Sequence, residues 1–429
     1  MFTKINSMRK YYVFIAALMM MVVSVGMGQT AYIANGTDST VSVIDVNSNT
    51  VTHTIQVGFH TVGVSVSPDG NKVYVGNTSN NTISVINTAT NTVTAIIPVG
   101  SYPIGICVSP DNSKVYVANS FDNTVDEINA LADTVTNTIF VGNGPGGITI
   151  SPDGNTAYVT NENGNSISVI NTSTNSIVTT IAVGTNPIGI TVSPDNSKIY
   201  VANYHSNTIN VINALTNTVT DTITVGSNPS GIVLSPDGSK LFVGNYYGNT
   251  VSVINTTTKI ITATIPVGIG PDGISISPDG SKVYIANEGY NKISVINTLT
   301  NIVTDSIIVG HSPVSLGNFI STYTQPNGIA ILNNQEATIT IAPNPFTSET
   351  TITFSEEQTY TIVKVRNILG EEIKTLVISA ANQITLEKGT MQAGIYFLEI
   401  TDSSTSAGSV NAASSPTRKN VVNKKVVVQ

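Results

Sequence analysis

The side chains that could do chemistry are few, and they lie apart from one another in the sequence. The 429 residues include four His, one Cys and no Trp. His60 and His311 could approach each other and ligate a metal, but no carboxylate stands at a fixed motif spacing beside them. Cys107 has no second Cys, which excludes an intrachain disulfide and a multi-Cys zinc site. A thiol nucleophile would need a base that cannot be identified, so we expect Cys107 to be a small packed residue.

Catalytic motifs are also missing. The chain has no Gly-x-Ser-x-Gly turn, which would expose a nucleophilic serine, and no Gly-rich phosphate loop between a strand and a helix. Because no nucleophile and base can be assembled, we expect a non-catalytic protein without a cofactor or a bound metal. A hydrolase or lyase with a metal-assisted site is the alternative.

The charge of the chain disfavours nucleic acid as a partner. Charged residues make up 10% of the sequence, against an average of about 25% in globular proteins. Residues 30–320 contain 7 Lys, no Arg and 17 Asp plus Glu, which gives a net charge of −10. Binding to phosphate backbones depends on Lys and Arg contacts, so we expect no nucleic-acid partner.

The first 28 residues have the pattern of an export signal. Lys4, Arg9 and Lys10 precede an apolar run over 11–27, and the small residues Gly26 and Gly28 favour cleavage after Gly28. A membrane anchor is the alternative, but the run is slightly short of the roughly 20 residues that a span needs. We therefore expect a cleaved signal peptide over 1–28, no membrane span in the mature chain, and a mature protein outside the cytoplasm.

A 42-residue repeat governs the next 290 residues or so. The turn Ser-Pro-Asp-Gly/Asn recurs six times, with prolines at 68, 110, 152, 194, 236 and 278. A second mark, an aromatic, an aliphatic, a small residue or Thr, and then Asn, recurs seven times in the same register, from Tyr32 to Tyr284. One period contains four short alternating segments rich in β-branched residues, separated by turn residues. Four strands repeated at this length are typical of a propeller blade.

The positions of the repeats predict an all-β, seven-bladed propeller over 29–320. The mature chain begins at the second strand of a blade, near Tyr32, so that blade lacks its own first strand. A later segment must return to complete the sheet and close the ring. Residues 313–320 keep the 42-residue spacing. Residues 326–332 match the Pro-x-Gly-Ile motif better but need a 13-residue insertion.

These motifs resemble the YVTN family of β-propeller repeats. The resemblance rests on Tyr-Val-x-Asn, Ser-Pro-Asp-Gly and Val-Gly-x-x-Pro-x-Gly, and it covers residues 30–320. It implies a surface-layer or cell-surface protein. Related seven-bladed folds include lactonases and lyases, whose sites need converging Arg, Glu and His, whereas this propeller has no Arg. A lactonase-like site at the channel mouth is thus the alternative function.

After Ile320 the repeat stops, and residues 321–337 are expected to form a linker. Residues 338–429 are predicted to form a small antiparallel β-sandwich with a hairpin near Gly370. They resemble the type A C-terminal sorting domain of type IX secretion, which implies a secretion translocon as partner and attachment at the cell surface. The matching residues are Pro343, Asn344, Pro345, Gly370, Gly394, Tyr396, Lys424 and Lys425.

One face of the predicted ring varies between repeats, and it is the candidate binding face. The opposite face consists of near-identical Ser-Pro-Asp and Asn-Thr turns, and variation on one face of a repeat protein is typical of ligand binding. Exposed aromatics among polar neighbours suit a glycan or protein ligand. Drift in loops that need only be soluble is the alternative. The candidate ligand-binding residues are Phe59, His60, Tyr102, Phe121, Tyr204, His205, Tyr246, Tyr247, Asp272, Tyr290 and His311.

Overall fold

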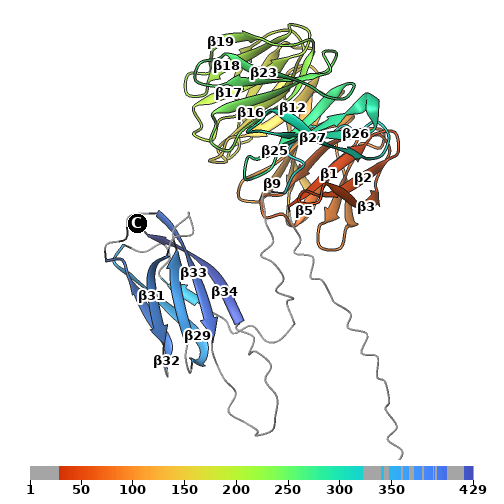
Figure 1. Ribbon diagram of the computed structural model, residues 1–429. Coiled ribbons are helices and arrows are strands. Elements are labelled where there is room, and N and C mark those ends of the chain that lie inside the picture. The colour runs from red at the N-terminus through yellow and green to blue at the C-terminus, as the bar shows by residue number, and fades with distance from the viewer. Residues whose placement is uncertain are drawn as a thin grey trace, which may run out of the picture. The chain divides into compact units, whose positions relative to one another are not determined.

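The computed structural model describes residues 29–321 and, nearer the C-terminus, residues 340–342, 347–358, 361–366, 372–378, 381–389, 391, 394–402 and 420–428. The chain divides into two compact units, residues 1–329 and 330–429, and each is described by itself (Figure 1). The expected signal peptide and the alternative closing segment 326–332 lie outside the described residues.

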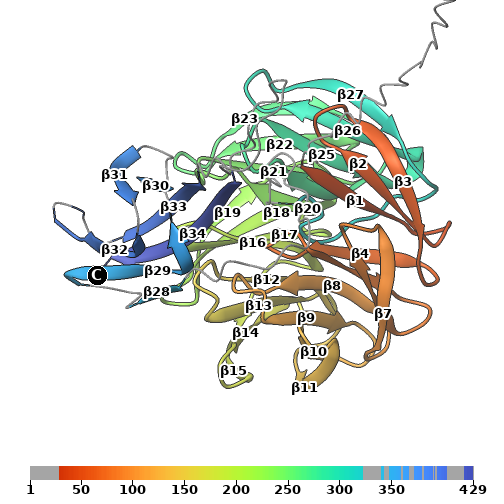
Figure 2. The ribbon, with the colours of Figure 1, turned by 90° about the horizontal axis from the view of Figure 1, so that it is seen from below.

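The first unit is a seven-bladed β-propeller, as the repeats predict (Figure 2). Six blades are antiparallel sheets of four consecutive strands, which we call A to D from the axis outward. Blade 2 contains β4 (Thr61–Val66), β5 (Lys72–Asn77), β6 (Thr82–Asn87) and β7 (Thr92–Pro98). Blade 3 contains β8 (Pro103–Val108), β9 (Lys114–Asn119), β10 (Thr124–Asn129) and β11 (Thr134–Phe140). Blade 4 contains β12 (Pro145–Ile150), β13 (Thr156–Asn161), β14 (Ser166–Asn171) and β15 (Ser176–Ala182).

The remaining complete blades follow the same order. Blade 5 contains β16 (Pro187–Val192), β17 (Lys198–Asn203), β18 (Thr208–Asn213) and β19 (Thr218–Thr224). Blade 6 contains β20 (Pro229–Leu234), β21 (Lys240–Asn245), β22 (Thr250–Asn255) and β23 (Ile261–Pro266). Blade 7 contains β24 (Pro271–Ile276), β25 (Lys282–Asn287), the 3-10 turn η1 (Glu288–Tyr290), β26 (Lys292–Asn297) and β27 (Ile302–Ile308).

Blade 1 is assembled from both ends of the repeat array. It contains β1 (Thr30–Asn35), β2 (Thr40–Asp45) and β3 (Thr50–Gln56), and the segment after Ser312 takes the place of its strand A. Val314 N donates to Ala34 O and Tyr32 N donates to Phe319 O, both at 2.9 Å. Bridges also pair Asn35 with Pro313 and Ala31 with Ile320. Residues 313–320 are therefore the closing segment, as the 42-residue spacing predicts.

The repeated turns explain why every blade adopts the same shape. In the A–B turn of blade 2, Ser67 Oγ donates to Asp69 Oδ1 at 2.6 Å, and Gly70 has a φ of +72°. At the C–D turn, Asn87 Oδ1 accepts hydrogen bonds from the backbone N–H groups of Ala89 and Thr90. Side chains that bond to their own turn in this way are the reason Asp and Asn are favoured there.

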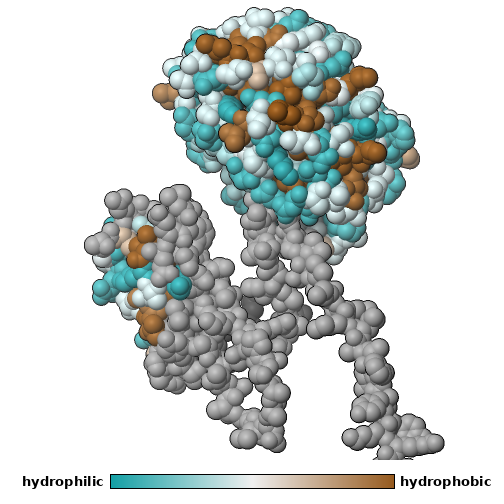
Figure 3. Space-filling view, in the orientation of Figure 1, coloured by the Kyte–Doolittle hydropathy of each residue, from teal (hydrophilic) through white to brown (hydrophobic). Residues whose placement is uncertain are grey.

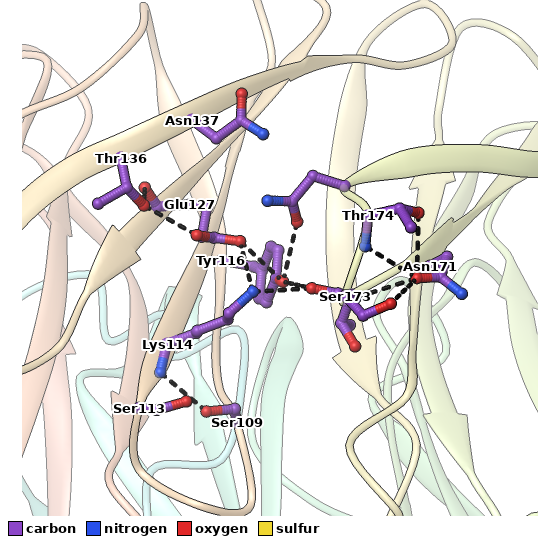
Figure 4. A network of polar contacts seen from close by, with 12 residues as sticks. Ser109, Ser113, Lys114, Tyr116, Glu127, Thr136, Asn137, Asn171, Ser173 and Thr174 are labelled. Carbon is purple, nitrogen blue, oxygen red and sulfur yellow. Dashed lines mark hydrogen bonds and ion pairs between the residues drawn. The ribbon is translucent and has the colours of Figure 1, made fainter.

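Apolar side chains fill the spaces between neighbouring blades, and polar bonds link the blades at their edges. In the network of Figure 4, Lys114 Nζ donates to Thr172 O of the next blade at 2.7 Å and to Glu127 Oε2 at 2.9 Å. The hydroxyl of the buried Tyr116 donates to the same Thr172 carbonyl at 3.3 Å. The space-filling view shows that apolar surface on the visible face is broken into separate patches (Figure 3). Exposed apolar surface of this kind is normal on soluble proteins.

The second unit is a small antiparallel β-sandwich, as predicted. One sheet has the order β28 (Thr340–Ala342), β29 (Glu349–Gln358) and β32 (Ala381–Glu387). The other has the order β31 (Glu372–Ile378), β30 (Thr361–Arg366), β33 (Gly394–Asp402) and β34 (Asn420–Val428). Its core draws side chains from both sheets, including Ile352, Val363, Leu386 and Leu398.

The predicted sorting residues are only partly described. Gly394 begins β33, Tyr396 is buried in the core, and Lys424 and Lys425 lie in β34 opposite Leu398 and Phe397. Pro343, Asn344, Pro345 and Gly370 lie outside the described residues. In the part of the chain that the structure describes, no helix has the length and hydropathy needed to cross a membrane.

Candidate functional site

The A strands approach each other around the axis through glycine. Each begins with the motif Pro-x-Gly or a variant of it. A backbone carbonyl oxygen of the next blade lies close against the glycine. A Cβ placed on Gly189 would collide with Ser230 O, and one placed on Gly231 would collide with Asp272 O. Only glycine allows this approach, which holds the x positions of successive blades side by side. The x residues are Val62, Ile104, Gly146, Ile188, Ser230, Asp272 and Val314.

The first residue of each B–C loop forms a second series at the same end of the ring. In blades 1 to 3 this residue is small, whereas in blades 4 to 7 it is a carboxylate or a tyrosine. In blade order the seven residues are Gly36, Thr78, Ser120, Glu162, Tyr204, Tyr246 and Glu288. Large polar side chains therefore gather on the side of the ring that blades 4 to 7 form. We call Glu162, Tyr204, Tyr246, Asp272 and Glu288 the mouth cluster.

Hydrogen bonds connect the mouth cluster across blades 6 and 7. The Tyr246 hydroxyl donates to Glu288 Oε2 at 2.5 Å, and these two residues occupy the same position in successive repeats. Ser312 Oγ donates to Glu288 Oε1 at 3.2 Å. Beneath them, Ser230 Oγ donates to Asp272 Oδ1, again between equivalent positions of neighbouring blades. Equivalent positions of neighbouring blades thus carry a hydrogen-bond donor in one blade and an acceptor in the next.

Glu162 occupies space that a missing side chain leaves open. A Cβ on Gly146 would collide with Glu162 Oε1, and the next two nearest atoms also belong to Glu162. The other x positions carry side chains, so blade 4 alone combines a glycine there with a carboxylate above it. Among the described residues, the Glu162 carboxylate accepts no hydrogen bond, and the charge of Asp272 acts on it from blade 7.

Burial and repulsion from like charges raise the pKa values of two of these carboxyls toward neutral pH. Burial, with a contribution from Asp272, raises the pKa of Glu162 to about 7. Burial also raises the pKa of Asp272 to about 6; the bond from Ser230 opposes this rise and the charge of Glu288 adds to it. A low-dielectric environment disfavours the charged form, and a like charge has the same effect. The cluster therefore carries negative charge that water solvates poorly.

Aromatic rings of blades 5 and 6 pack together beside these carboxylates. The ring centroid of Tyr204 lies 6.1 Å from that of Tyr246 and 6.2 Å from that of Tyr247, and the last two are 5.1 Å apart. His205 packs edge-on against Tyr204 at 5.1 Å. Burial is the main cause that raises the pKa of Tyr204 and Tyr246. The neighbouring Tyr247 adds to the rise at Tyr204 and Glu288 adds to it at Tyr246, so both hydroxyls keep their protons. Tyr247 is 68% exposed and presents its ring to solvent.

A second aromatic pair lies on the same face at blade 3. Tyr102 stacks on Phe121, with centroids 4.3 Å apart and ring planes 9° from parallel, although Phe121 is 71% exposed. Tyr102 has a φ of +61° at a linker position where blade 4 has Gly144 and blade 5 has Asn186. The same linker position has a positive φ in the other blades as well, for example +55° at both His60 and Ser312, so this backbone conformation belongs to the repeat.

The other predicted site residues do not join the mouth cluster. Phe59 and Tyr290 are exposed, and the Lys292 ammonium lies 4.7 Å from the Tyr290 ring centroid. His60 Nδ1 is 3.0 Å from Thr78 Oγ1, whereas His311 Nδ1 is 2.9 Å from Asp38 Oδ1. The two histidines therefore have separate partners rather than a shared one.

The remaining reactive groups are poorly placed for chemistry. In the described part of the chain, no three His, Cys, Asp or Glu side chains come together in a way that could hold a metal ion. Cys107 packs between blades 3 and 4, and burial raises the pKa of its thiol to about 12. A thiol with so high a pKa is a poor nucleophile at neutral pH.

The sequence prediction included Tyr204, Tyr246 and Asp272. It placed Glu162 and Glu288 on the variable face without selecting them as ligand-binding residues, and it did not include Ser230. The signal for these three is in the repeat itself. At the x position and at the first B–C loop position, blades 4 to 7 carry polar or aromatic side chains where blades 1 to 3 have apolar or small ones; Gly146 and Ile188 are the exceptions.

Comparisons with known families agree with both units. Residues 340–409 match the family described as secretion system C-terminal sorting domain. The C-terminal unit is a secretion system C-terminal sorting domain. Such a domain indicates export and a cell-surface or extracellular location. Within the propeller, residues 123–220 match the family described as lactonase, 7-bladed beta-propeller. The sorting domain thus follows a propeller whose family match leaves catalysis open.

Solved structures share the propeller fold. Hydrazine synthase of Kuenenia stuttgartiensis is 22% identical with a TM-score of 0.55, over 59% of this chain and 88% of that chain. A functionally unknown protein from Desulfotomaculum acetoxidans DSM 771 is 19% identical with a TM-score of 0.60, over 68% and 98% respectively. At these identities the likeness concerns the fold alone. No curated protein matches the chain in sequence.

Proposed function

We propose that the mature protein is displayed at the cell surface by its sorting domain and binds a ligand on the loop face of the propeller without catalysing a reaction. In this proposal residues 1–28 are a cleaved signal peptide, 29–320 the binding propeller, 321–337 a linker and 338–429 the sorting domain. The type IX translocon is the partner of the sorting domain. A surface glycan or protein, or neighbouring subunits of a surface layer, is the partner of the propeller.

The mouth cluster is the observation that carries the binding role. Six blades share the same Ser-Pro-Asp turn on one face, whereas the opposite face has aromatic and acidic side chains in blades 4 to 7. The bond between Tyr246 and Glu288 joins two such side chains across a blade boundary. Side chains that vary between repeats and still pair with one another favour a shaped site over drift in soluble loops.

Surface labelling of intact cells tests the display. The full chain should be labelled by an antibody that cannot cross the outer membrane, and a chain without residues 340–429 should stay inside. Equal labelling of the two chains would contradict the role of the sorting domain. A glycan array with the purified mature protein tests the binding role, and a failure to bind any glycan or surface component would contradict it.

A lactone hydrolase is the second candidate, and two observations favour it. The lactonase family match includes Glu162, and its pKa of about 7 suits a general base at neutral pH. Hydrolysis of a lactone panel by the mature protein, lost in Glu162→Gln, would replace the binding proposal with this one. Absence of turnover across the panel would leave binding as the function.

A further inference from the structure

The carboxylates of the mouth cluster have no cation to balance them. Four ion pairs join described residues: Lys72 with Asp133, Lys114 with Glu127, Lys259 with Asp221, and His311 with Asp38. None of them includes Glu162, Asp272 or Glu288. The charged groups that act on Glu162 and Asp272 are other carboxylates. The cluster is thus a site of concentrated negative charge in surroundings that solvate it poorly, which favours a cation.

The aromatic rings give this site a second and independent preference, for an organic cation. Tyr246 donates a hydrogen bond to Glu288, and the charges of Asp272 and Glu288 act on Tyr204. Tyr247 and His205 extend this aromatic surface outward. Ring faces carry partial negative charge, so they attract organic cations. Aromatic rings beside the carboxylates therefore favour an ammonium group attached to carbon.

The groups in the site leave one carboxylate available to a ligand. Glu288 already accepts bonds from Tyr246 and Ser312, and Asp272 accepts one from Ser230. Glu162 accepts none from the described residues, and it lies above Gly146, where no side chain competes for its oxygens. An ammonium group has three N–H donors and could satisfy this carboxylate.

We propose that the mouth cluster binds a protonated primary amine of an organic ligand, with Glu162 and Asp272 as counter-ions and the tyrosine rings packed against the carbon skeleton. This inference rests on the proposed binding function and specifies its ligand class. Two sources offer that chemistry, an amino sugar and an aliphatic polyamine. The aromatic surface suits either one, because both combine an ammonium group with apolar C–H surface.

Calorimetric titration of the mature protein with three probes tests the proposal. The probes are a glucosamine trisaccharide, the N-acetylglucosamine trisaccharide of the same length, and spermidine. We expect one or both cationic probes to bind at least about tenfold more tightly than the neutral trisaccharide, since one charge-assisted contact is worth about that factor. Which cationic probe binds more tightly identifies the source of the amine.

Variants connect the binding to named side chains. Glu162→Gln and Asp272→Asn keep the side-chain shape and should each weaken the cationic probe about tenfold or more. Asp38→Asn, which removes a carboxylate bonded to His311 at the outer part of the same face, is the matched control and should leave the affinity unchanged. Thermal unfolding of each variant shows whether the fold is intact. If Glu162→Gln fails to fold, the same comparison is made with Glu162→Ala.

Proton release provides a readout that a purely structural role would not change. A cation beside Glu162 and Asp272 favours their charged forms, so binding at about pH 6.5 should release protons. The binding enthalpy should then depend on the ionisation enthalpy of the buffer, and this dependence should shrink in Glu162→Gln. Equal binding of the neutral trisaccharide, or no binding of either cationic probe, would overturn the inference. The first of these results would leave the proposed function standing.

Discussion

The Lys282 ammonium donates a hydrogen bond to the carbonyl oxygen of Val46 at 2.9 Å, across 236 residues of sequence. The same bond joins blades that follow each other in the chain, for example from Lys114 Nζ to Thr172 O at 2.7 Å. The hydroxyls of Tyr284 and Tyr116 donate hydrogen bonds to the same two carbonyl oxygens, of Val46 and Thr172 respectively. The boundary between blades 7 and 1 therefore repeats the lysine and tyrosine bonds of the internal boundaries.

Closure predicts that the ends of the propeller stabilise each other. Phe319 in the closing segment is fully buried in the core shared by blades 1, 2 and 7. Phe319→Ala should lower the free energy of unfolding by about 3–5 kcal/mol, the usual cost of removing a buried aromatic ring. Chemical denaturation of the mature chain measures this change in the free energy of unfolding. The control is Phe121→Ala, which removes an exposed ring and should cost much less; equal losses would contradict closure by residues 313–320.

The raised pKa of Glu162 predicts a stability that depends on pH. The folded-state pKa is about 7 and the usual value is 4.5, so folding favours the protonated form. The stability that protonation of Glu162 contributes is lost as pH rises through about 7. The charged group that acts on this carboxyl is Asp272, which is itself a carboxylate and not a cation. Glu162→Gln should therefore raise the melting temperature at pH 8 and change it little at pH 4.5.

Asp195 serves as a control because its pKa is shifted in the opposite direction. Hydrogen bonds from Ser193 and Ser197 lower its pKa to about 2, so its contribution is present above the usual carboxyl pKa and disappears as pH falls toward 2. Asp195→Asn should lower the melting temperature at pH 7, with a difference that shrinks in acid. Parallel pH profiles for the two variants would refute the assignment of their environments.

The pairing of Gly146 with Glu162 predicts a coupling between these positions. Gly146→Ala places a Cβ against the Glu162 carboxylate, so the flexible Glu162 side chain must shift and the wild-type chain should lose a modest amount of stability. In a Glu162→Ala background the space is free, and the same change should cost little. A double-mutant cycle on unfolding free energies measures the difference. Additive effects would show that Glu162 does not occupy the space above Gly146.

Much of the fold follows from the sequence because the repeat is strict. Each Ser-Pro-Asp turn fixes the start of a strand, and the strand after the turn at Pro110 runs over Lys114–Asn119 in the structure. The closing segment follows from the spacing of Pro313 alone. Tyr32, Tyr74 and Tyr116 are buried, in line with their regular recurrence.

The site was harder to predict because it depends on side chains from different blades. The bond between Tyr246 and Glu288 and the approach of Asp272 to Glu162 depend on how the ring brings positions of the repeat together. Sequence reasoning selected exposed aromatics, and it grouped His60 with His311 by their linkers. The structure gives these histidines the separate partners Thr78 and Asp38, because each one turns toward the nearest B–C loop.

A glycan array probed with three forms of the mature protein tests most directly that the loop face is the binding face. The forms are wild type, Tyr246→Ala with Tyr247→Ala, and Leu131→Ala with Leu215→Ala, whose leucines are exposed at C–D turns on the opposite face. We predict that the tyrosine variant loses the wild-type signal and that the leucine variant keeps it. A signal that survives in the tyrosine variant, or disappears only in the leucine variant, would contradict the account.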